Sequence, residues 1–162
     1  MFDDLSQVKR RYEELAYRMT TPEAMNDPAA YAAMMREYKE LTPLVEAYRS
    51  YTALQKEVGL PVKPDVPLMV MVTRLAGHKG LDLLCYIARR LIWEEDAQLL
   101  ILGTGEAQYE SFFKDLANQF PDQVSAQITF NLGLAARIYA GGDIYLMPSK
   151  SEPCGLSQMN AM

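Results

Sequence analysis

The sequence is poor in residues that build disulfide frameworks and metal sites. It has two cysteines and one histidine in 162 residues, and neither Cys85 nor Cys154 belongs to a CxxC or a cysteine–histidine cluster. A disulfide framework and a zinc site therefore have little support, and we expect no metal. The cysteine usage fits a reducing, cytoplasmic compartment.

Long apolar runs and basic blocks are also absent. No apolar run approaches the length that spans a bilayer, and Met1 is followed at once by Phe2, Asp3 and Asp4 rather than by a secretory signal. Sixteen basic and 21 acidic residues give a net charge of -5. We therefore expect no membrane association, and the charge argues against a nucleic-acid partner.

Residues 1–54 have the apolar period of amphipathic helices. Capping residues followed by proline, at Thr21-Pro22 and Asp27-Pro28, predict two helix starts, and Thr42-Pro43 predicts a kink or a restart. Two helices folded back as a hairpin would bury both apolar stripes, and spacing alone explains their tyrosines and methionines as packing residues. The stripes contain Phe2, Leu5, Val8, Tyr12, Leu15 and Met19, then Tyr31, Met34, Met35, Tyr38, Leu41, Val45, Tyr48 and Tyr51.

Residues 55–162 alternate between strand and helix patterns. Strands are expected at 68–73, 97–102, 124–130 and 143–148, and helices near 79–93, 106–119, 134–140 and from 155 onward. Such alternation predicts an α/β fold, a truncated Rossmann-like parallel sheet of about four strands with helices. Ligands of these sheets bind at the carboxyl ends of the strands.

The loops after the first and second predicted strands carry candidate ligand-binding residues. Arg74 and Lys79 flank a loop that opens a helix, where they would converge on a phosphate or remain a solvated surface pair. Gly103 and Gly105 permit close approach of a ligand, but Gln108 replaces the third glycine of GxGxxG, so a tight turn explains them as well.

The loop after the fourth strand, "PSKSEPCGLS", has the features of an anion site. Glu152 would hydrogen-bond ligand hydroxyls, and Gly155, Leu156 and Ser157 would present backbone N–H groups at a helix start. His78 has no evident carboxylate partner in the sequence and is interpreted as an ordinary loop histidine.

The segment from about residue 53 to residue 162 resembles the bacterial glycogen and starch synthases. The resemblance rests on "LQKEVGLPVKPDVPLMVMVTRLAGHKGLDLL", "DAQLLILGTGEAQYE" and "RIYAGGDIYLMPSKSEPCGLSQMNAM". It implies a glycosyltransferase that transfers glucose from ADP-glucose to an α-glucan. Arg74 and Lys79 would bind the diphosphate, Glu152 would contact glucose near the reacting carbon, and Gly155 to Ser157 would bind the distal phosphate.

This segment departs from the family pattern at three places. His78 stands where the family commonly has glutamine, Ser157 where threonine is usual, and Met159-Asn160 where a leucine-tyrosine pair is common. The N-terminal Rossmann-like domain that catalysis in the family needs has no counterpart in these residues.

The first 52 or so residues resemble the N-terminal helical domain of bacterial peptide chain release factor one. "MFDDLSQVKRRYEELAYRM" and "NDPAAYAAMMREYKELTPLVEAYRSY" carry this resemblance. The family's Gly-Gly-Gln motif and its codon-reading Pro-x-Thr tripeptide do not occur in the sequence. The sequence thus resembles a chimera of two family fragments.

Three functions follow from these resemblances. The first is binding of ADP or ADP-glucose without turnover, with no cofactor and with an α-glucan as a candidate second ligand. The second is a non-catalytic chimera that binds no ligand. The third is a release-factor module in which residues 1–54 dock on a protein partner, because seven basic and nine acidic residues there disfavour RNA.

Overall fold

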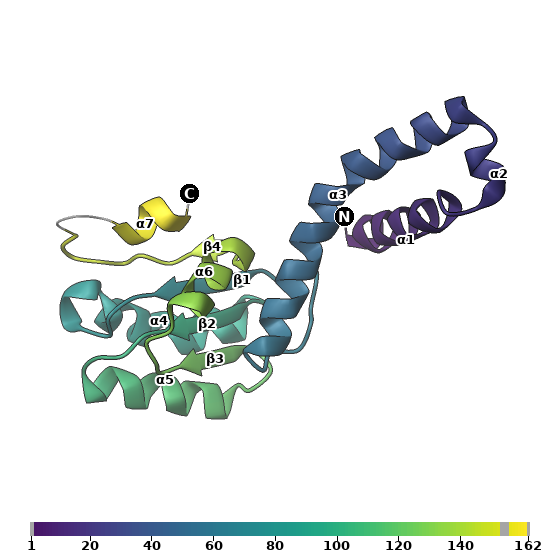
Figure 1. The fold of residues 1–162 in the computed structure, drawn as a ribbon. Helices are drawn as coiled ribbons and strands as arrows, with labels where there is room; N and C mark the ends of the chain where they lie inside the picture. Colours follow the sequence, from purple (N-terminus) through teal and green to yellow (C-terminus); the bar gives the residue numbers. More distant parts are fainter. Residues whose placement is uncertain (1, 153–155, 162) are drawn as a thin grey trace. The chain divides into compact units, whose positions relative to one another are not determined.

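The computed structural model describes residues 2–152 and 156–161. It divides into two compact units between Ser50 and Tyr51 (Figure 1). The first unit is helical, and the second contains a parallel sheet with helices on both faces. The predicted α/β class with a helical N-terminal region is confirmed.

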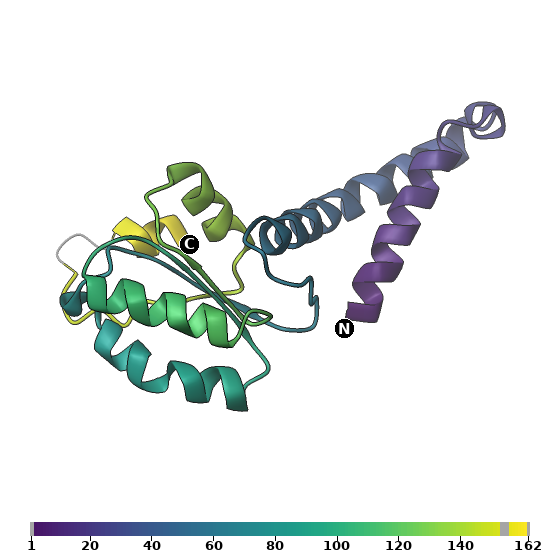
Figure 2. The ribbon, with the colours of Figure 1, turned by 90° about the horizontal axis from the view of Figure 1, so that it is seen from below.

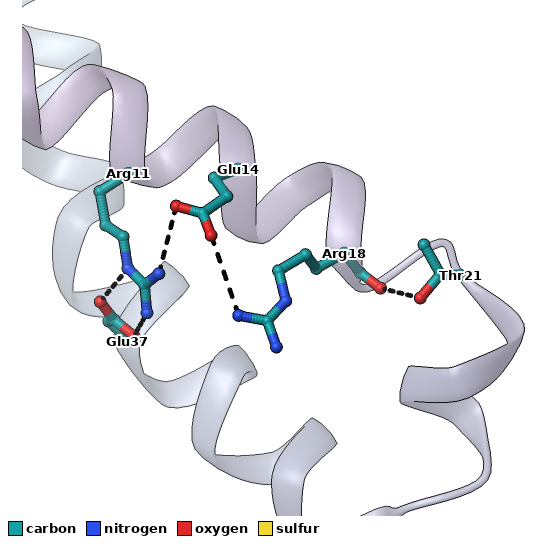
Figure 3. Close-up of polar contacts among 5 residues, drawn as sticks. All are labelled: Arg11, Glu14, Arg18, Thr21 and Glu37. Atoms are coloured by element: carbon teal, nitrogen blue, oxygen red, sulfur yellow. Dashed lines mark hydrogen bonds and ion pairs between the residues drawn. The ribbon is translucent and has the colours of Figure 1, made fainter.

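The helical unit begins with α1 (Phe2–Arg18) and α2 (Pro22–Met25), followed by α3 (Pro28–Glu57). Asp27 caps α3, since its Oδ1 atom accepts from the backbone N–H groups of Ala29 and Ala30, both at 3.0 Å. Thr21 makes no side-chain cap at α2, and its hydroxyl donates to the Arg18 carbonyl at 2.9 Å instead (Figure 3). Both helix starts lie where capping residue and proline predict them.

Aromatic and apolar side chains pack between the helices of this unit. The rings of Tyr12 and Tyr38 stack with centroids 4.3 Å apart, and their hydroxyls lie 2.6 Å apart. Arg11 Nε donates to Glu37 across the hairpin at 2.7 Å, and this bond lowers the pKa of the Glu37 carboxyl (Figure 3). Met19, Tyr31 and Tyr38 thus serve packing, around a core formed by Leu15, Ala24 and Met34.

The expected restart at Thr42-Pro43 does not occur. α3 continues through Pro43, which lies inside a helix of 30 residues. Pro43 removes one backbone donor, and the Thr42 hydroxyl donates to the Tyr38 carbonyl at 2.8 Å in the same turn. The restart prediction was wrong because a long helix tolerates the loss of one of its many hydrogen bonds.

The second unit is built on four parallel strands in the order β3-β2-β1-β4. Val70 pairs with Leu100, and Leu100 pairs with Ser125 in the next strand. The central strands are buried on both faces, as their unbroken apolar runs predict. The strands are β1 (Leu68–Val72), β2 (Gln98–Leu102), β3 (Val124–Gln127) and β4 (Ile144–Tyr145), so β4 is shorter than the predicted 143–148.

Helices cover both faces of this sheet. α4 (Leu81–Glu94) and α5 (Ala107–Gln119) pack on one face around Phe113, whereas α6 (Leu132–Gly141) packs on the other around Ile138 (Figure 2). A short 3-10 helix, η1 (Gly77–Lys79), precedes α4, and α7 (Leu156–Ala161) follows β4. The crossovers leave the carboxyl ends of all four strands on one edge.

The C-terminal end of α3 belongs to the core of the second unit. Leu54 and Val58 are buried against the same sheet face as α6. Gln55 Nε2 donates to Gln98 Oε1 at 2.7 Å, and both side chains are fully buried. The helix therefore continues past residue 54, where the sequence pattern placed the end of the helical domain.

Candidate functional site

An ion pair joins η1, after β1, to the segment that follows β4. Lys79 Nζ donates to Glu152 Oε1 at 2.5 Å, and Ser149 Oγ donates to the same oxygen at 2.6 Å. The Lys79 and Glu152 side chains are only 15% and 21% exposed. These donors, Lys79 first, hold the pKa of the Glu152 carboxyl below its ordinary value. Glu152 is therefore ionised at neutral pH, which suits an acceptor or a charge stabiliser rather than a proton donor.

A glycine allows the segment after β4 to pass close to the start of α4. Gly80 has φ +71°, and a Cβ added there would lie 2.0 Å from the Pro148 carbonyl oxygen. Lys150 makes two hydrogen bonds next to this close approach. Its backbone N–H donates to the His78 carbonyl at 3.0 Å, and its Nζ donates to Asp82 at 2.6 Å. Local backbone contacts therefore hold Glu152 within reach of Lys79.

The glycines after β2 accommodate the protein's own backbone. A Cβ on Gly103 would lie 1.8 Å from the Thr73 carbonyl oxygen, and one on Gly105 would lie 2.1 Å from the Leu75 carbonyl oxygen. The Gly105 N–H donates to Glu110 Oε1 at 2.9 Å. The tight packing of two strand-end loops is thus sufficient to explain both glycines, without a ligand.

The loops after β1 and β2 are joined by backbone and carboxylate contacts. The Leu75 N–H donates to the Thr104 carbonyl, and the Glu106 N–H donates to the Leu75 carbonyl, at 2.9 and 2.7 Å. Glu106 Oε1 accepts from the Gly77 N–H at 3.0 Å, which lowers the pKa of that carboxyl. The Gly77 and Gly105 N–H groups are therefore satisfied by this chain's carboxylates.

A pocket of about 510 Å³ opens at the carboxyl ends of β1, β2 and β3. Its apolar walls include the exposed side chains of Phe130 and Leu132 and the ring of Tyr139. Arg74 is exposed on its lining and has no hydrogen bond or ion pair with any residue that the structure describes. The lining comprises Val72, Thr73, Arg74, Leu102, Gly103, Thr104, Gly105, Thr129, Phe130, Asn131, Leu132, Ala135, Tyr139 and Asn160.

The structure separates the predicted site residues into two groups. Arg74 lines the pocket together with Gly103 and Gly105, whereas Lys79 and Glu152 form the ion pair and are not part of the pocket lining. Gly155 lies outside the described residues. Leu156 and Ser157 begin α7, with side chains that are not described.

Sequence reasoning missed several residues of this edge. Ser149 binds Glu152, and Phe130 is 82% exposed beside the pocket. The phenylalanine in the short loop between β3 and α6 could have indicated a binding surface, because an apolar side chain in such a loop is far from the hydrophobic core. Nothing in the sequence places Asn160 in the pocket, since the position of α7 depends on tertiary packing.

Two features are absent from residues 2–152 and 156–161. No three His, Cys, Asp or Glu side chains there gather in a way that could hold a metal ion. No helix in these ranges is long and apolar enough to cross a membrane.

Two family descriptions match different parts of the chain. Glycosyl transferases group 1 matches residues 52–162, and the PCRF domain matches residues 8–62. The two matches overlap at residues 52–62, where the end of α3 enters the core of the second unit. The chimera predicted from the two resemblances is therefore supported by both family matches.

The curated relatives of this chain include glycogen synthases. Glycogen synthase of Exiguobacterium sibiricum is 49% identical over 141 residues, covering 78% of this chain and 29% of the relative. Glycogen synthase of Clostridium perfringens is 54% identical over 110 residues, covering 68% of this chain and 23% of the relative. The chain thus spans about a quarter of the length of these curated relatives.

A solved structure shows the same fold. The catalytic domain of starch synthase IV from Arabidopsis thaliana, bound to ADP and acarbose, superposes with a TM-score of 0.64 at 31% identity. The match covers 71% of this chain and 24% of that one. The chain belongs to the glycosyl transferases group 1 family, and its second unit is similar to part of the glycogen and starch synthases.

Proposed function

We propose that residues 52–162 bind a nucleoside diphosphate glucose, with ADP-glucose as the donor. The observation that carries this proposal is the pocket at the carboxyl ends of β1 to β3, where ligands of open α/β sheets bind. Its apolar walls suit a base and a ribose, and Arg74 brings a guanidinium fork that matches phosphate geometry. ADP in the related starch synthase structure supports the same ligand class.

Lys79 and Glu152 are proposed to hold the rest of the donor. Lys79 would bind the diphosphate, and Glu152 would contact glucose near the reacting carbon. A carboxylate that stays ionised stabilises positive charge that develops at an anomeric carbon. Lys79 Nζ pairs with Glu152 at 2.5 Å, and because an ammonium carries three N–H donors, it would bind the phosphate without opening that pair.

For these 162 residues we propose binding without turnover. They correspond to 29% and 23% of the two glycogen synthases, and an α-glucan acceptor is the second ligand that the family implies. The assignment of Gly155, Leu156 and Ser157 to the distal phosphate stays a prediction.

The test is a thermal melt with millimolar ADP-glucose, combined with ligand-observed NMR. A ligand that binds only the folded state raises its stability, by about 2.7 kcal/mol at a concentration 100 times Kd. We expect Arg74→Ala to lose most of this gain. Arg90→Ala is the matched control, because Arg90 is an exposed guanidinium on α4 that pairs with Glu94 at 3.5 Å.

An unchanged melt would contradict donor binding and favour the chimera without a ligand. An Arg74→Ala variant that ADP-glucose stabilises as much as the wild type would show that the donor does not bind at this pocket. Loss in both arginine variants would indicate a general charge effect rather than a site.

A second candidate function concerns residues 1–50 and is favoured by the PCRF match. The hairpin has its own core of Leu15, Ala24 and Met34, so it can present a formed helical surface to a protein partner. The test is cosedimentation with purified bacterial ribosomes and direct binding to a release-factor methyltransferase. Absence of both interactions at physiological salt would end this proposal.

A further inference from the structure

Asn160 places an amide group on the lining of the pocket. The residue lies in α7, which contacts α6, and is exposed, and its side chain has no hydrogen bond to any residue that the structure describes. The apolar part of the pocket lining includes Phe130 and Leu132, which are 82% and 71% exposed, and Tyr139 of α6. Exposed apolar side chains around a pocket are suited to stack on a flat ring.

The chemistry of a carboxamide limits what this residue can recognise. It offers one oxygen acceptor and an NH₂ donor side by side, so it pairs with a ring edge that presents a donor next to an acceptor. Adenine has such an edge, because its 6-amino group lies beside a ring nitrogen, and asparagine forms a two-bond contact with adenine in other contexts. A purine that carries only hydrogen at the 6-position leaves one of the two amide atoms without a partner.

We propose that Asn160 recognises the 6-amino edge of the base and makes the pocket favour adenine nucleotides over purine nucleotides that lack the 6-amino group. This inference rests on the proposed function, since it assigns the base end of a nucleotide to the side of the pocket formed by Phe130, Leu132 and Asn160. Arg74 then takes the phosphates at the end of β1, next to the β2 loop. Asn160 is a specificity residue and takes no part in bond making.

The experiment compares two nucleotides that differ only at the 6-position. Dissociation constants are measured by NMR titration for ADP and for purine riboside 5′-diphosphate, which lacks the 6-amino group. Wild type, Asn160→Ala and Met159→Ala are compared. Met159 is the control because it is the adjacent residue of α7, is 59% exposed and is not part of the pocket lining.

The wild type is expected to bind ADP about tenfold more tightly than the analogue, since one bond of the two-bond contact is lost. In Asn160→Ala the ratio should fall below about threefold, while Met159→Ala keeps the wild-type ratio. A double comparison of this kind isolates the contact between one side chain and one ligand group. Equal melting temperatures of the three proteins confirm that the fold is unchanged.

Three results would overturn the inference. A wild type that binds both nucleotides equally shows that the amino group is not read. An Asn160→Ala ratio equal to that of the wild type shows that another group reads it, and the proposed donor binding then still stands. If neither nucleotide binds the wild type, donor binding fails as well, so the two failures are distinguishable.

Discussion

Replacing Gly103 by alanine tests whether the glycines after β2 serve the protein's backbone or a ligand. The added Cβ would lie 1.8 Å from the Thr73 carbonyl oxygen, where ordinary contact begins at about 3.4 Å. The ends of β1 and β2 must therefore move apart. The movement strains the hydrogen bonds from Thr73 N–H to the Leu102 carbonyl and from Leu75 N–H to the Thr104 carbonyl, at 3.1 and 2.9 Å.

The expected loss of stability follows from these contacts. Forced backbone shifts cost about 1–3 kcal/mol, and each of the two weakened hydrogen bonds costs about 1 kcal/mol, which together give about 3–5 kcal/mol. For a unit of this size that corresponds to a melting temperature lower by about 15 °C. The assay is differential scanning calorimetry without ligand.

Gly133→Ala is the matched control for this substitution. Its Cβ would meet only Asn131 and Arg137 side-chain atoms, at 3.5 and 3.6 Å, inside α6. Alanine there should raise stability by about 0.5–1 kcal/mol, because glycine is unfavourable in a helix. If Gly103→Ala melted within about 2 °C of the wild type but bound ADP more weakly, the backbone explanation would be refuted and the glycine would serve the ligand.

Two further predictions concern the core and the ion pair. Phe113→Ala should lower the free energy of unfolding in urea by about 3–5 kcal/mol, because Phe113 is fully buried. Trp93→Ala is the control: its side chain is 81% exposed, so the free energy of unfolding should stay within about 0.5 kcal/mol of the wild type. Similar losses in the two variants would contradict the assigned core. Lys79 lowers the pKa of Glu152 below 4.5, so this pair stabilises the fold above pH 4.5, and the stabilisation is lost as the pH falls through the lower folded pKa. The difference in melting temperature between wild type and Lys79→Met should therefore shrink between pH 6 and pH 3, and a constant difference would contradict this linkage.

Sequence periodicity predicted the elements better than their ends. The long apolar runs at 68–73 and 97–102 correspond to β1 and β2, because a strand buried on both faces needs no polar alternation. The prediction of 143–148 as a strand gave only Ile144–Tyr145, since β4 pairs with β1 over two residues before the chain turns toward Gly80. Thr42-Pro43 predicted a restart that packing and the remaining helix hydrogen bonds overrode.

The location of the candidate residues was predictable from the sequence, and their grouping was not. Arg74, Lys79, Gly103, Gly105 and Glu152 all lie at the predicted strand ends, because the carboxyl ends of parallel strands share one edge. The sequence could not show that Lys79 binds Glu152 while Arg74 lines a separate pocket. That distinction depends on how closely the loops after β1, β2 and β4 approach one another.

The sequence by itself determined the two-part organisation, the α/β class and the chemical types available at the strand ends. These follow from local periodicity, proline and glycine placement and motif spacing, which are properties of neighbouring residues. Only the tertiary structure decided that Gly80, Gly103 and Gly105 lie against backbone carbonyls, that Glu106 and Glu110 satisfy loop N–H groups, and that Asn160 reaches the pocket. These features join residues distant in sequence or depend on how whole elements pack, so no local pattern encodes them.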